Sequence, residues 1–389
     1  MKVNQIYEII NSITNEVTGK SDIVAEDLSN IIDVGKEIFD NTAVDNYVKS
    51  LVNHIGKVIF VNREYKGTAP TVLMDSWEYG SVLEKIQCEI PEAVQNDSWN
   101  LADGTSYDVN VFHAPKVSAK FYNNKNTFEI AMSFTEMQVK ESFSDVNQLN
   151  GFMSMIYSAI SRSMSIKTDS MIMRTINNMT AQTIANDFPN VSDNNYGTSD
   201  SPKAINLLKR YNTANSTTLT AKQAINNPDF IRYASFEMAL TVDRIKKMST
   251  LFNIGGKERF TPNDLLHIVM LSDFEKASEV FLQSDTYHDT LVKLPNAETV
   301  PFWQGSGTTY DFDTVSKINV TTNGDAAKNI NIGGILAVMF DRDSLGVCNY
   351  NERVTTNYNA KGEFFNNYYK YDCGYFNDSN ENFVVFFVA

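Results

Sequence analysis

The sequence contains no apolar run that approaches the roughly 20 residues of a membrane-spanning helix, and its first residues lack the apolar core of a signal peptide. We therefore expect a protein that is assembled in a cytosol and has no membrane partner. Cysteine is scarce as well: Cys88, Cys348 and Cys373 lie far apart without paired spacing. This argues against a disulfide framework and a structural zinc site. All three are expected to be small, buried or half-buried hydrophobic side chains.

Catalytic motifs are missing too. The sequence has no Walker A loop, no G-x-G-x-x-G after a strand and no G-x-S-x-G elbow. The histidines do not show the H-x-x-x-H or H-E-x-x-H spacing of a helical zinc site. They are His54, His113, His267 and His288. The sequence therefore predicts no enzyme, no catalytic residue, and no metal or cofactor site.

Two acidic clusters come nearest to a chemical site. Glu89, Glu92 and Asp97 could pair as acid and base, but nothing in the sequence fixes their geometry. Asp341 and Asp343 flank Arg342, an arrangement that more often forms an ion pair in a turn than a cation site. We interpret neither cluster as a functional centre.

An excess of positive charge is also absent. The 389 residues carry a formal net charge of −14, which disfavours direct nucleic-acid binding because phosphate contacts need clustered lysine and arginine. A protein that encloses DNA without gripping it is compatible with this charge. The hydrophobic content of 42% is ordinary, whereas the aromatic content of 12% is high and suits β-rich packing or large interfaces. The length allows two or three domains.

The last residues are apolar and β-prone. Residues 335–340 predict a strand that leads into the turn 341–343, and the chain later reaches Asn382-Phe-Val-Val-Phe-Phe-Val-Ala389. So many β-branched and aromatic residues are typical of a strand inside a sheet and not of a frayed tail. The final residues are therefore expected to close the fold.

The clearest single element is a long helix. Residues 152–188 contain neither glycine nor proline, and about 40 residues at 1.5 Å each would span roughly 60 Å. A break near 165–168 is the alternative. One apolar stripe recurs at helical spacing: Leu149, Met153, Ile156, Ile160 and Met164. The many methionines predict flexible packing against a sheet, in preference to a ligand or metal site.

A long two-stranded arm is predicted before this helix. After a strand at 57–63 comes a polar and aromatic stretch, 64–115, in which strands at 81–90 and 107–112 flank the turn-rich segment 96–104. An isolated hairpin is only marginally stable in water, so this one is expected to rest on a neighbour. The alternative is a β-sheet domain within the same chain.

The remaining segments predict a mixture of helices and strands. Residues 1–56 predict short helices, which form either an arm draped over another molecule or an ordinary helical subdomain. Further strands are predicted at 117–121, 127–134 and 265–271, and helices at 202–212, 229–252 and 273–282. Asn323-Gly324 predicts a hairpin turn between 318–320 and 330–332. Together these segments are typical of an α+β fold.

In this order, the segments resemble those of the major capsid proteins of tailed bacteriophages, which have the Hong Kong 97-type fold. They are most similar to a group of coat proteins from phages of low-GC Gram-positive hosts. The resemblance covers nearly the whole chain and is carried by residues 51–59, 117–122, 127–130, 137–143, 335–346, 353–359 and 381–385. None of these segments is a catalytic fingerprint.

The resemblance implies an α+β Hong Kong 97-type architecture with an N-arm, an extended hairpin called the E-loop, a peripheral domain with a long spine helix, and an axial domain. The implied ranges are an N-arm at 1–30, a first peripheral part at 31–63, the E-loop at 64–115, the peripheral domain with its spine helix at 116–200, the axial domain at 201–364 and a closing peripheral strand at 365–389. The E-loop would lie over an adjacent subunit, which supplies the neighbour that an isolated hairpin needs.

The function implied by the resemblance is that of a major capsid protein, a structural component of the virion without enzymatic activity or cofactors. Copies would assemble in the cytoplasm of a bacterial host into hexamers and pentamers of an icosahedral or elongated head shell. The shell would enclose double-stranded DNA without sequence-specific binding, and portal and scaffolding proteins are further implied partners.

Two alternatives are kept open. An encapsulin-type nanocompartment shell has the same fold but is typically shorter. A carbohydrate-binding module would suit the aromatic content, but it would need exposed tryptophan platforms from Trp77, Trp99 or Trp303.

Overall fold

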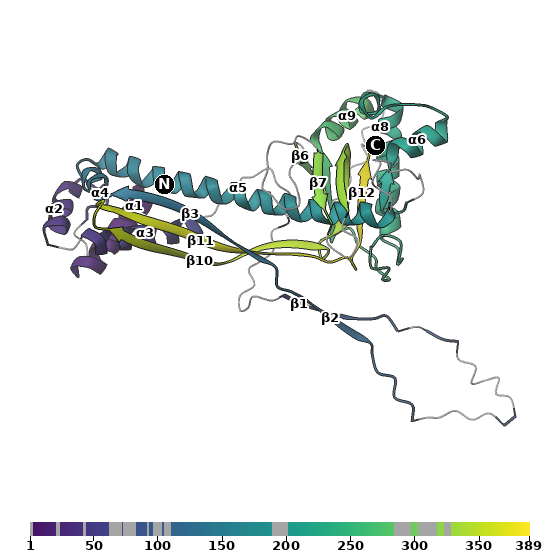
Figure 1. Ribbon diagram of the computed structural model, residues 1–389, viewed down its shortest axis with the longest axis horizontal. Helices are drawn as coiled ribbons and strands as arrows, with labels where there is room; N and C mark the ends of the chain where they lie inside the picture. Colours follow the sequence, from purple (N-terminus) through teal and green to yellow (C-terminus); the bar gives the residue numbers. More distant parts are fainter. Residues whose placement is uncertain are drawn as a thin grey trace.

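The computed structural model describes residues 3–20, 24–41, 44–61, 72, 83–91, 93–95, 103–104, 110–188, 201–283, 297–301, 303, 317–322 and 328–389. The molecule is elongated along one long helix, α5 (Val146–Asp187). The N-terminal helices lie at one end of α5, and a second group of helices and strands lies at the other end (Figure 1). A hairpin leaves the body between them and extends away from it.

The long helix α5 spans 42 residues and continues through residues 165–168. The shorter helix α4 (Glu136–Ser142) precedes it and begins with a capping box between Thr135 and Gln138. The side chain of Asp145 then accepts a hydrogen bond from the backbone N–H of Asn147 at the start of α5. The apolar stripe predicted for this helix is buried. The predicted long helix is therefore confirmed, although it begins earlier than residue 152.

One side of α5 packs on a three-stranded sheet in the order β10–β11–β3. The strands are β3 (Lys125–Thr135), β10 (Leu345–Asn359) and β11 (Phe364–Asn377), and both pairs are antiparallel. Along β3 every second side chain packs against the core, for example Phe128 and Ile130, whereas Thr127 and Glu129 are exposed. This alternation confirms the strand predicted at 127–134, with one face buried.

Three helices at the N-terminal end pack beside α5: α1 (Val3–Thr18), α2 (Ile31–Asn41) and α3 (Val44–Val61). Helix α1 contacts α3 and α5, and α3 contacts β10. Of the two interpretations of residues 1–56, the packed helical subdomain is the one seen in the chain. The strand predicted at 57–63 is wrong over its described part, because α3 continues to Val61. Its β-branched run fits either element, and the buried helical stripe that ends with Leu51, Val52 and Ile55 extends the helix into it.

The far end of α5 carries a five-stranded sheet in the order β4–β12–β9–β5–β6. The strands are β4 (Ala204–Asn206), β5 (Leu266–Leu271), β6 (Ala297–Val300), β9 (Ile335–Asp341) and β12 (Phe383–Phe387). Strand β12 is parallel to β4 and antiparallel to β9, and every residue of β9 and β12 is buried. The prediction that the final apolar strand lies inside a sheet is confirmed.

The elements around this sheet include four helices: α6 (Leu207–Asn215), α7 (Ala221–Ala224), α8 (Pro228–Ile245) and α9 (Ser272–Gln283). Helix α6 begins after the predicted residue 202, because residues 204–206 form β4 beside β12. Helix α8 ends before the predicted residue 252. There the carbonyl of Ile245 accepts a hydrogen bond from the backbone of Thr261, and Ser249 pairs with Arg259.

A small hairpin completes this end of the molecule. It consists of β7 (Lys317–Thr321) and β8 (Asn329–Gly333), which are antiparallel. The pair confirms the predicted hairpin, whose turn at Asn323-Gly324 lies outside the described residues.

The closing segment 365–389 is divided between the two large sheets. Strand β11 is central in the three-stranded sheet, but β12 lies in the five-stranded sheet and not in that of the expected peripheral domain. Conversely β10, within the range 201–364, pairs with β11 beside α5. Strand β12 is buried throughout, as an interior strand is, and β4 and β9 pair with its two edges. The α+β fold is as predicted, whereas its sheets do not follow the expected boundary at 364.

Candidate functional site

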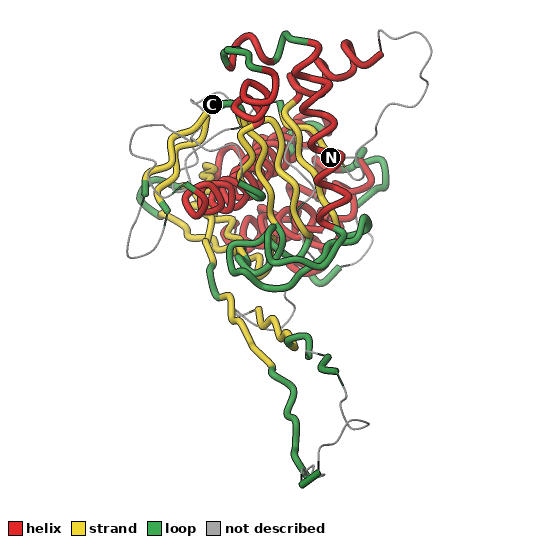
Figure 2. Tube along the Cα trace, turned by 90° about the vertical axis from the view of Figure 1, so that its right-hand side faces the viewer, coloured by secondary structure: helices red, strands yellow, loops and turns green. Residues whose placement is uncertain are grey.

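The extended hairpin consists of β1 (Leu83–Cys88) and β2 (Val117–Tyr122), which are antiparallel. It points away from the rest of the molecule in both views (Figure 1, Figure 2). Strand β1 confirms the strand predicted at 81–90. The partner strand predicted at 107–112 is not found in its described part, 110–112; β2, predicted as a separate strand at 117–121, takes its place.

The two faces of the hairpin have opposite chemistry, because side chains alternate along a strand. The face toward the body carries the polar side chains of Lys85, Gln87 and Lys120. The other face is exposed and mostly apolar, with one acid; it consists of Glu84, Ile86, Cys88, Val117, Ala119 and Phe121. Ile86 and Phe121 are each 64% exposed. In a strand with one solvent-exposed face, the apolar face is usually the buried one; in this hairpin the apolar face is the exposed one.

Lys85 attaches β1 to the body through three oxygen atoms. Its ammonium nitrogen lies 3.0 Å from Oδ2 of Asp378, 2.9 Å from Oε1 of Glu381 and 3.2 Å from the backbone oxygen of Asp343. The oxygens of Glu381 and Asp343 accept hydrogen bonds from the ammonium group, and Asp378 adds an ion pair. Burial alone would lower the pKa of Lys85, but its bonds to Glu381 and the charge of Asp378 hold that pKa above its ordinary value.

Lys120 attaches β2 to the same acid. Its Nζ lies 2.7 Å from Oδ1 of Asp378, whose side chain is fully buried. In the register of the hairpin Lys120 is directly opposite Lys85, a like-charge pair that destabilises an isolated ribbon. Asp378 compensates both charges. Burial alone would raise the pKa of Asp378, but the bonds from Lys120 and the backbone of Asn380, with the charge of Lys85, lower it.

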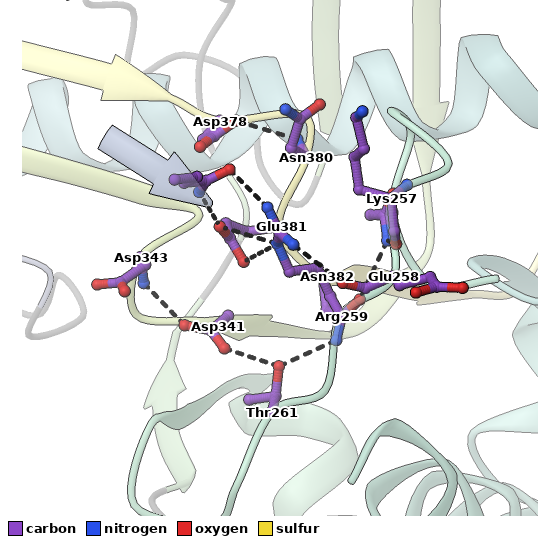
Figure 3. A network of polar contacts seen from close by, with 12 residues as sticks. Lys257, Glu258, Arg259, Thr261, Asp341, Asp343, Asp378, Asn380, Glu381 and Asn382 are labelled. Atoms are coloured by element: carbon purple, nitrogen blue, oxygen red, sulfur yellow. Dashed lines mark hydrogen bonds and ion pairs between the residues drawn. The ribbon is translucent and has the colours of Figure 1, made fainter. Parts of the chain in front are cut away.

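Arg259 forms a second junction between the hairpin and the body. Its Nη2 donates to Oε1 of Gln87 at 2.5 Å, and its Nε lies 3.3 Å from the carboxylate of Glu381. Gln87 in turn donates to Oε1 of Glu381 at 2.7 Å. Two residues beyond Gln87, just past the end of β1, Glu89 lies 3.0 Å from Lys257. Figure 3 shows Glu381 and Arg259 near the centre of this network.

Residues 378–382, here called the C-terminal turn, are fixed by buried hydrogen bonds. The side chain of Asn382 donates to Oγ1 of Thr261, which donates to Oδ2 of Asp341 at 2.7 Å (Figure 3). The backbone N–H of Asp343 donates to Oδ1 of Asp341 at 3.0 Å. The sequence predicts that Asp341 or Asp343 forms an ion pair with Arg342; in the structure Asp341 instead accepts these hydrogen bonds from Thr261 and Asp343. Burial raises the pKa of Asp341.

The other candidate chemical residues are not brought together. Over the part of the chain that the structure describes, no group of three metal-binding side chains could hold an ion. His54 lies on α3, 3.0 Å from the backbone oxygen of Ser50, and His267 lies on β5, 3.1 Å from Glu298. Glu89 pairs with Lys257 and not with a second acid. Outside the described residues lie His288, Glu92, Asp97, Trp77 and Trp99.

Cys348 and Cys373 are buried as predicted, whereas Cys88 is exposed on the apolar face of the hairpin, so its predicted burial is wrong. Trp303 is buried and offers no platform for a sugar. Among the described helices, none is long and apolar enough to cross a membrane.

Sequence reasoning missed the residues that hold the hairpin, namely Asp378, Glu381 and Arg259. One signal was present: along 85–89 the polar and apolar residues alternate, which predicts a strand with one polar and one apolar face. Nothing local identifies the partners, because they come from distant parts of the chain.

A profile of one protein family, described as "Phi29-like phage major capsid protein", matches residues 10–387. A comparison with curated proteins finds no match. Among solved structures, the chain is similar to the capsid of Staphylococcus phage Andhra, with 9% identity, a TM-score of 0.49 and 84% of each chain covered. It is also similar to the capsid of the cyanophage P-SCSP1u, with 10% identity, a TM-score of 0.46, and 85% of this chain and 92% of that chain covered. Both TM-scores are below 0.5, so the assignment of a family rests on the profile match.

Proposed function

The chain belongs to the family of Phi29-like phage major capsid proteins, and from this premise we propose that its hairpin is a contact through which copies join into a closed shell. A major capsid protein forms the head shell, so the chain is a structural component of the virion and not an enzyme. Its α+β fold, with α5 as the spine helix, is of the Hong Kong 97 type. Family membership favours the phage shell over the nanocompartment alternative.

The observation that supports the hairpin's role is its exposed apolar face. Ile86, Val117 and Phe121 are each more than half exposed, and beyond the strands Phe112 is 87% exposed. Contiguous apolar surface of this kind marks interaction sites. Covering each such side chain stabilises a contact by about 1.5–3 kcal/mol. A two-stranded ribbon has no second layer of its own, and in a self-assembling family another copy is the natural source of that layer.

The contact is proposed to be heterologous: the hairpin of one copy lies over the peripheral domain of the next. Contacts of this type close into rings, and the proposed rings are the hexamers and pentamers of the shell. The E-loop is proposed at 64–115, and its base is formed by β1 inside this range and by β2 just after it. Residues 1–30, expected as an N-arm, contribute α1 to the helical subdomain of their own chain. The peripheral domain is then α5 with the three-stranded sheet, and the axial domain contains the five-stranded sheet, including β12.

The shell is proposed to enclose double-stranded DNA, with portal and scaffolding proteins as further partners of the head. The net charge of −14 supports enclosure without gripping, because a strongly acidic surface repels phosphate.

Expression of the chain alone tests the proposal. We expect negative-stain microscopy and sedimentation velocity to show closed shells, or rings of about five or six copies, because heterologous contacts close into rings. Phe121→Asp should abolish assembly, because an unpaired carboxylate would be buried in the contact. The melting temperature of the free subunit should not change, since Phe121 is 64% exposed there.

Ala119→Ser is the matched control, because Ala119 is on the same face of β2 but changes little in size and gains no charge. It should assemble like the wild type. A wild-type protein that stays a monodisperse monomer at high concentration would contradict shell formation by the chain alone. Normal assembly of Phe121→Asp would leave the shell in place and remove the hairpin as its contact.

A further inference from the structure

We propose that Asp378 is a positioning residue for assembly: the C-terminal turn directs the hairpin, so that a copy presents its apolar face only after β11 and β12 have both joined their sheets. This inference rests on the proposed function, because it concerns how the assembly contact is prepared. It goes beyond that function by proposing that the C-terminal turn controls when the hairpin can bind a neighbouring copy.

The hairpin cannot fix its own direction. Its two strands have 6 residues each, and a ribbon of this kind is marginal in water. Lys85 and Lys120 face each other across it, which weakens the ribbon further. Ile86 and Phe121 lie on the exposed face, so they add nothing to its attachment to its own body. The attachment therefore depends on the inward face, where Tyr122 packs on Phe376 of β11 with ring centroids 5.1 Å apart and Lys85, Lys120 and Gln87 make polar contacts.

Those contacts come from distant parts of the sequence. Asp378 is 258 positions away from Lys120, and Glu381 is 296 positions away from Lys85. Arg259 contacts Gln87 on β1 and Glu381 on the C-terminal turn, so it links the two. The strands of the hairpin can pair locally, but their direction is set only when the end of the chain is in place.

The C-terminal turn is in turn held by both large sheets. At its start, Asp378 follows the last residue of β11, and its backbone N–H donates to the carbonyl of Ser344 at 2.6 Å. Just after the turn, the backbone N–H of Phe383 donates to the carbonyl of Phe252 at 2.8 Å. The backbone N–H of Asp341, at the end of β9, donates to the carbonyl of Asn382 at 3.0 Å. These last two bonds depend on β12 lying beside β9. Asp378 therefore reaches the hairpin when the three-stranded sheet is in place, and Glu381 reaches it only in a copy in which β12 is also in place.

The consequence is a coupling between folding and assembly. Without the turn, the hairpin samples many directions, and only a fraction of copies at any moment offers the apolar face in the orientation that a neighbour can accept. A binding-competent state that is only fractionally populated lowers the apparent affinity by that fraction. Incompletely folded copies are thereby kept out of the growing shell.

Hydrogen–deuterium exchange of the unassembled subunit tests positioning separately from assembly. In Asp378→Asn we expect the amides of β1 and β2 to exchange about tenfold faster than in the wild type. The amides of β9 and β12 should keep wild-type protection, and assembly followed by light scattering should slow by a similar factor. The matched control is Glu129→Gln, which removes a 3.0 Å ion pair with Lys370 on the three-stranded sheet. It should change neither hairpin exchange nor assembly.

Lys120→Met covers the case in which Asp378→Asn does not fold, since it removes the 2.7 Å contact of Lys120 with Asp378 and keeps that of Lys85. It should also speed exchange in β1 and β2. The variant also removes the like-charge pair with Lys85, so faster exchange would mean that the lost contact outweighs this relief. Unchanged hairpin exchange in a folded variant overturns the proposal. So does an equal rise in β9 and β12, which indicates general destabilisation. The proposed function can fail independently: if the wild type forms no shells, or Phe121→Asp assembles normally, hairpin exchange still decides whether Asp378 positions the hairpin.

Discussion

At the scale of single residues, the attachment of the hairpin depends most on Asp378. Its buried carboxylate lies between ammonium groups from both strands, at 3.0 Å from Lys85 and 2.7 Å from Lys120. A buried charge persists only when it is compensated, and removal of one partner leaves the others uncompensated. Glu381 and the backbone of Asp343 still serve Lys85 when Asp378 is changed, whereas Lys120 loses the acid to which it is paired. The two strands should therefore respond unequally, with β2 loosened more than β1.

We expect the stability contributed by Asp378 to disappear in acid. Because its pKa is lowered in the folded protein, the contribution is fully present above the pKa of the unfolded chain, about 3.9, and is lost as the pH falls through the folded value. Asp378→Asn should therefore cost about 3 kcal/mol at neutral pH and almost nothing well below about pH 4. Urea unfolding of the free subunit at a series of pH values measures both.

Two neighbouring groups, Asp341 and Lys85, decide over which pH range the wild type and Asp378→Asn differ in their free energy of unfolding. Asp341 has a raised pKa, so its own effect on stability has the opposite sign, but it is present in both proteins and cancels. Lys85 has a raised pKa, so it stays charged until the pH rises past the ordinary lysine value of about 10.4. The difference should thus be flat from about pH 5 to about pH 9. A cost that persists unchanged in acid would mean that asparagine packs poorly there and that charge plays no part.

At the scale of elements, the sequence predicts well what depends on local periodicity. The stripe of α5, the alternation of β3 and the apolar run of β12 each specify both the element and its buried face. The end of α3 was mispredicted, because β-branched residues after Ile55 suit a strand as well as a helix. The partner of β1 was mispredicted for another reason. Segments 107–112 and 117–121 both have strand-like composition, and the register that forms is the one in which Lys120 reaches Asp378.

The base of the hairpin could not be predicted for the same physical reason. Its acids and its arginine come from positions 259, 378 and 381, which the pairing of β11 with β10 and of β12 with β9 brings near β1. A local pattern can show that the inward face of β1 is polar, but it cannot identify what that face contacts.

Strand β12 should behave as a core element although it is near the end of the sequence. Phe386 is fully buried and pairs with Ile205 of β4 and Ala337 of β9. Phe386→Ala should lower the free energy of unfolding by about 3–5 kcal/mol, because it removes buried apolar area and leaves a cavity. Phe236→Ala on α8, where the side chain is 61% exposed, is the control and should change it by about 0.5 kcal/mol or less. Similar values for both in urea unfolding would contradict a central place for β12.

At the scale of the whole molecule, two properties oppose each other during assembly. Each copy carries a net charge of −14, which repels other copies, and each presents an apolar hairpin face that attracts them. Charge repulsion is screened by salt: the Debye length falls from about 30 Å at 0.01 M to about 8 Å at 0.15 M ionic strength. Apolar contact is not weakened by this change, and Asp378 at the base of the hairpin is buried, where screening is much weaker.

We therefore expect moderate salt to speed assembly and to lower the protein concentration at which shells appear. Light scattering over a series of ionic strengths measures the rate, and microscopy establishes that the product is a shell. Phe121→Asp should show no such salt-promoted assembly, which separates the effect from non-specific precipitation. If assembly slows as salt is added, attraction between charged surfaces of different copies must exceed the net repulsion. Assembly would then be driven by contacts between those charged surfaces, and the apolar face of the hairpin would contribute little to it.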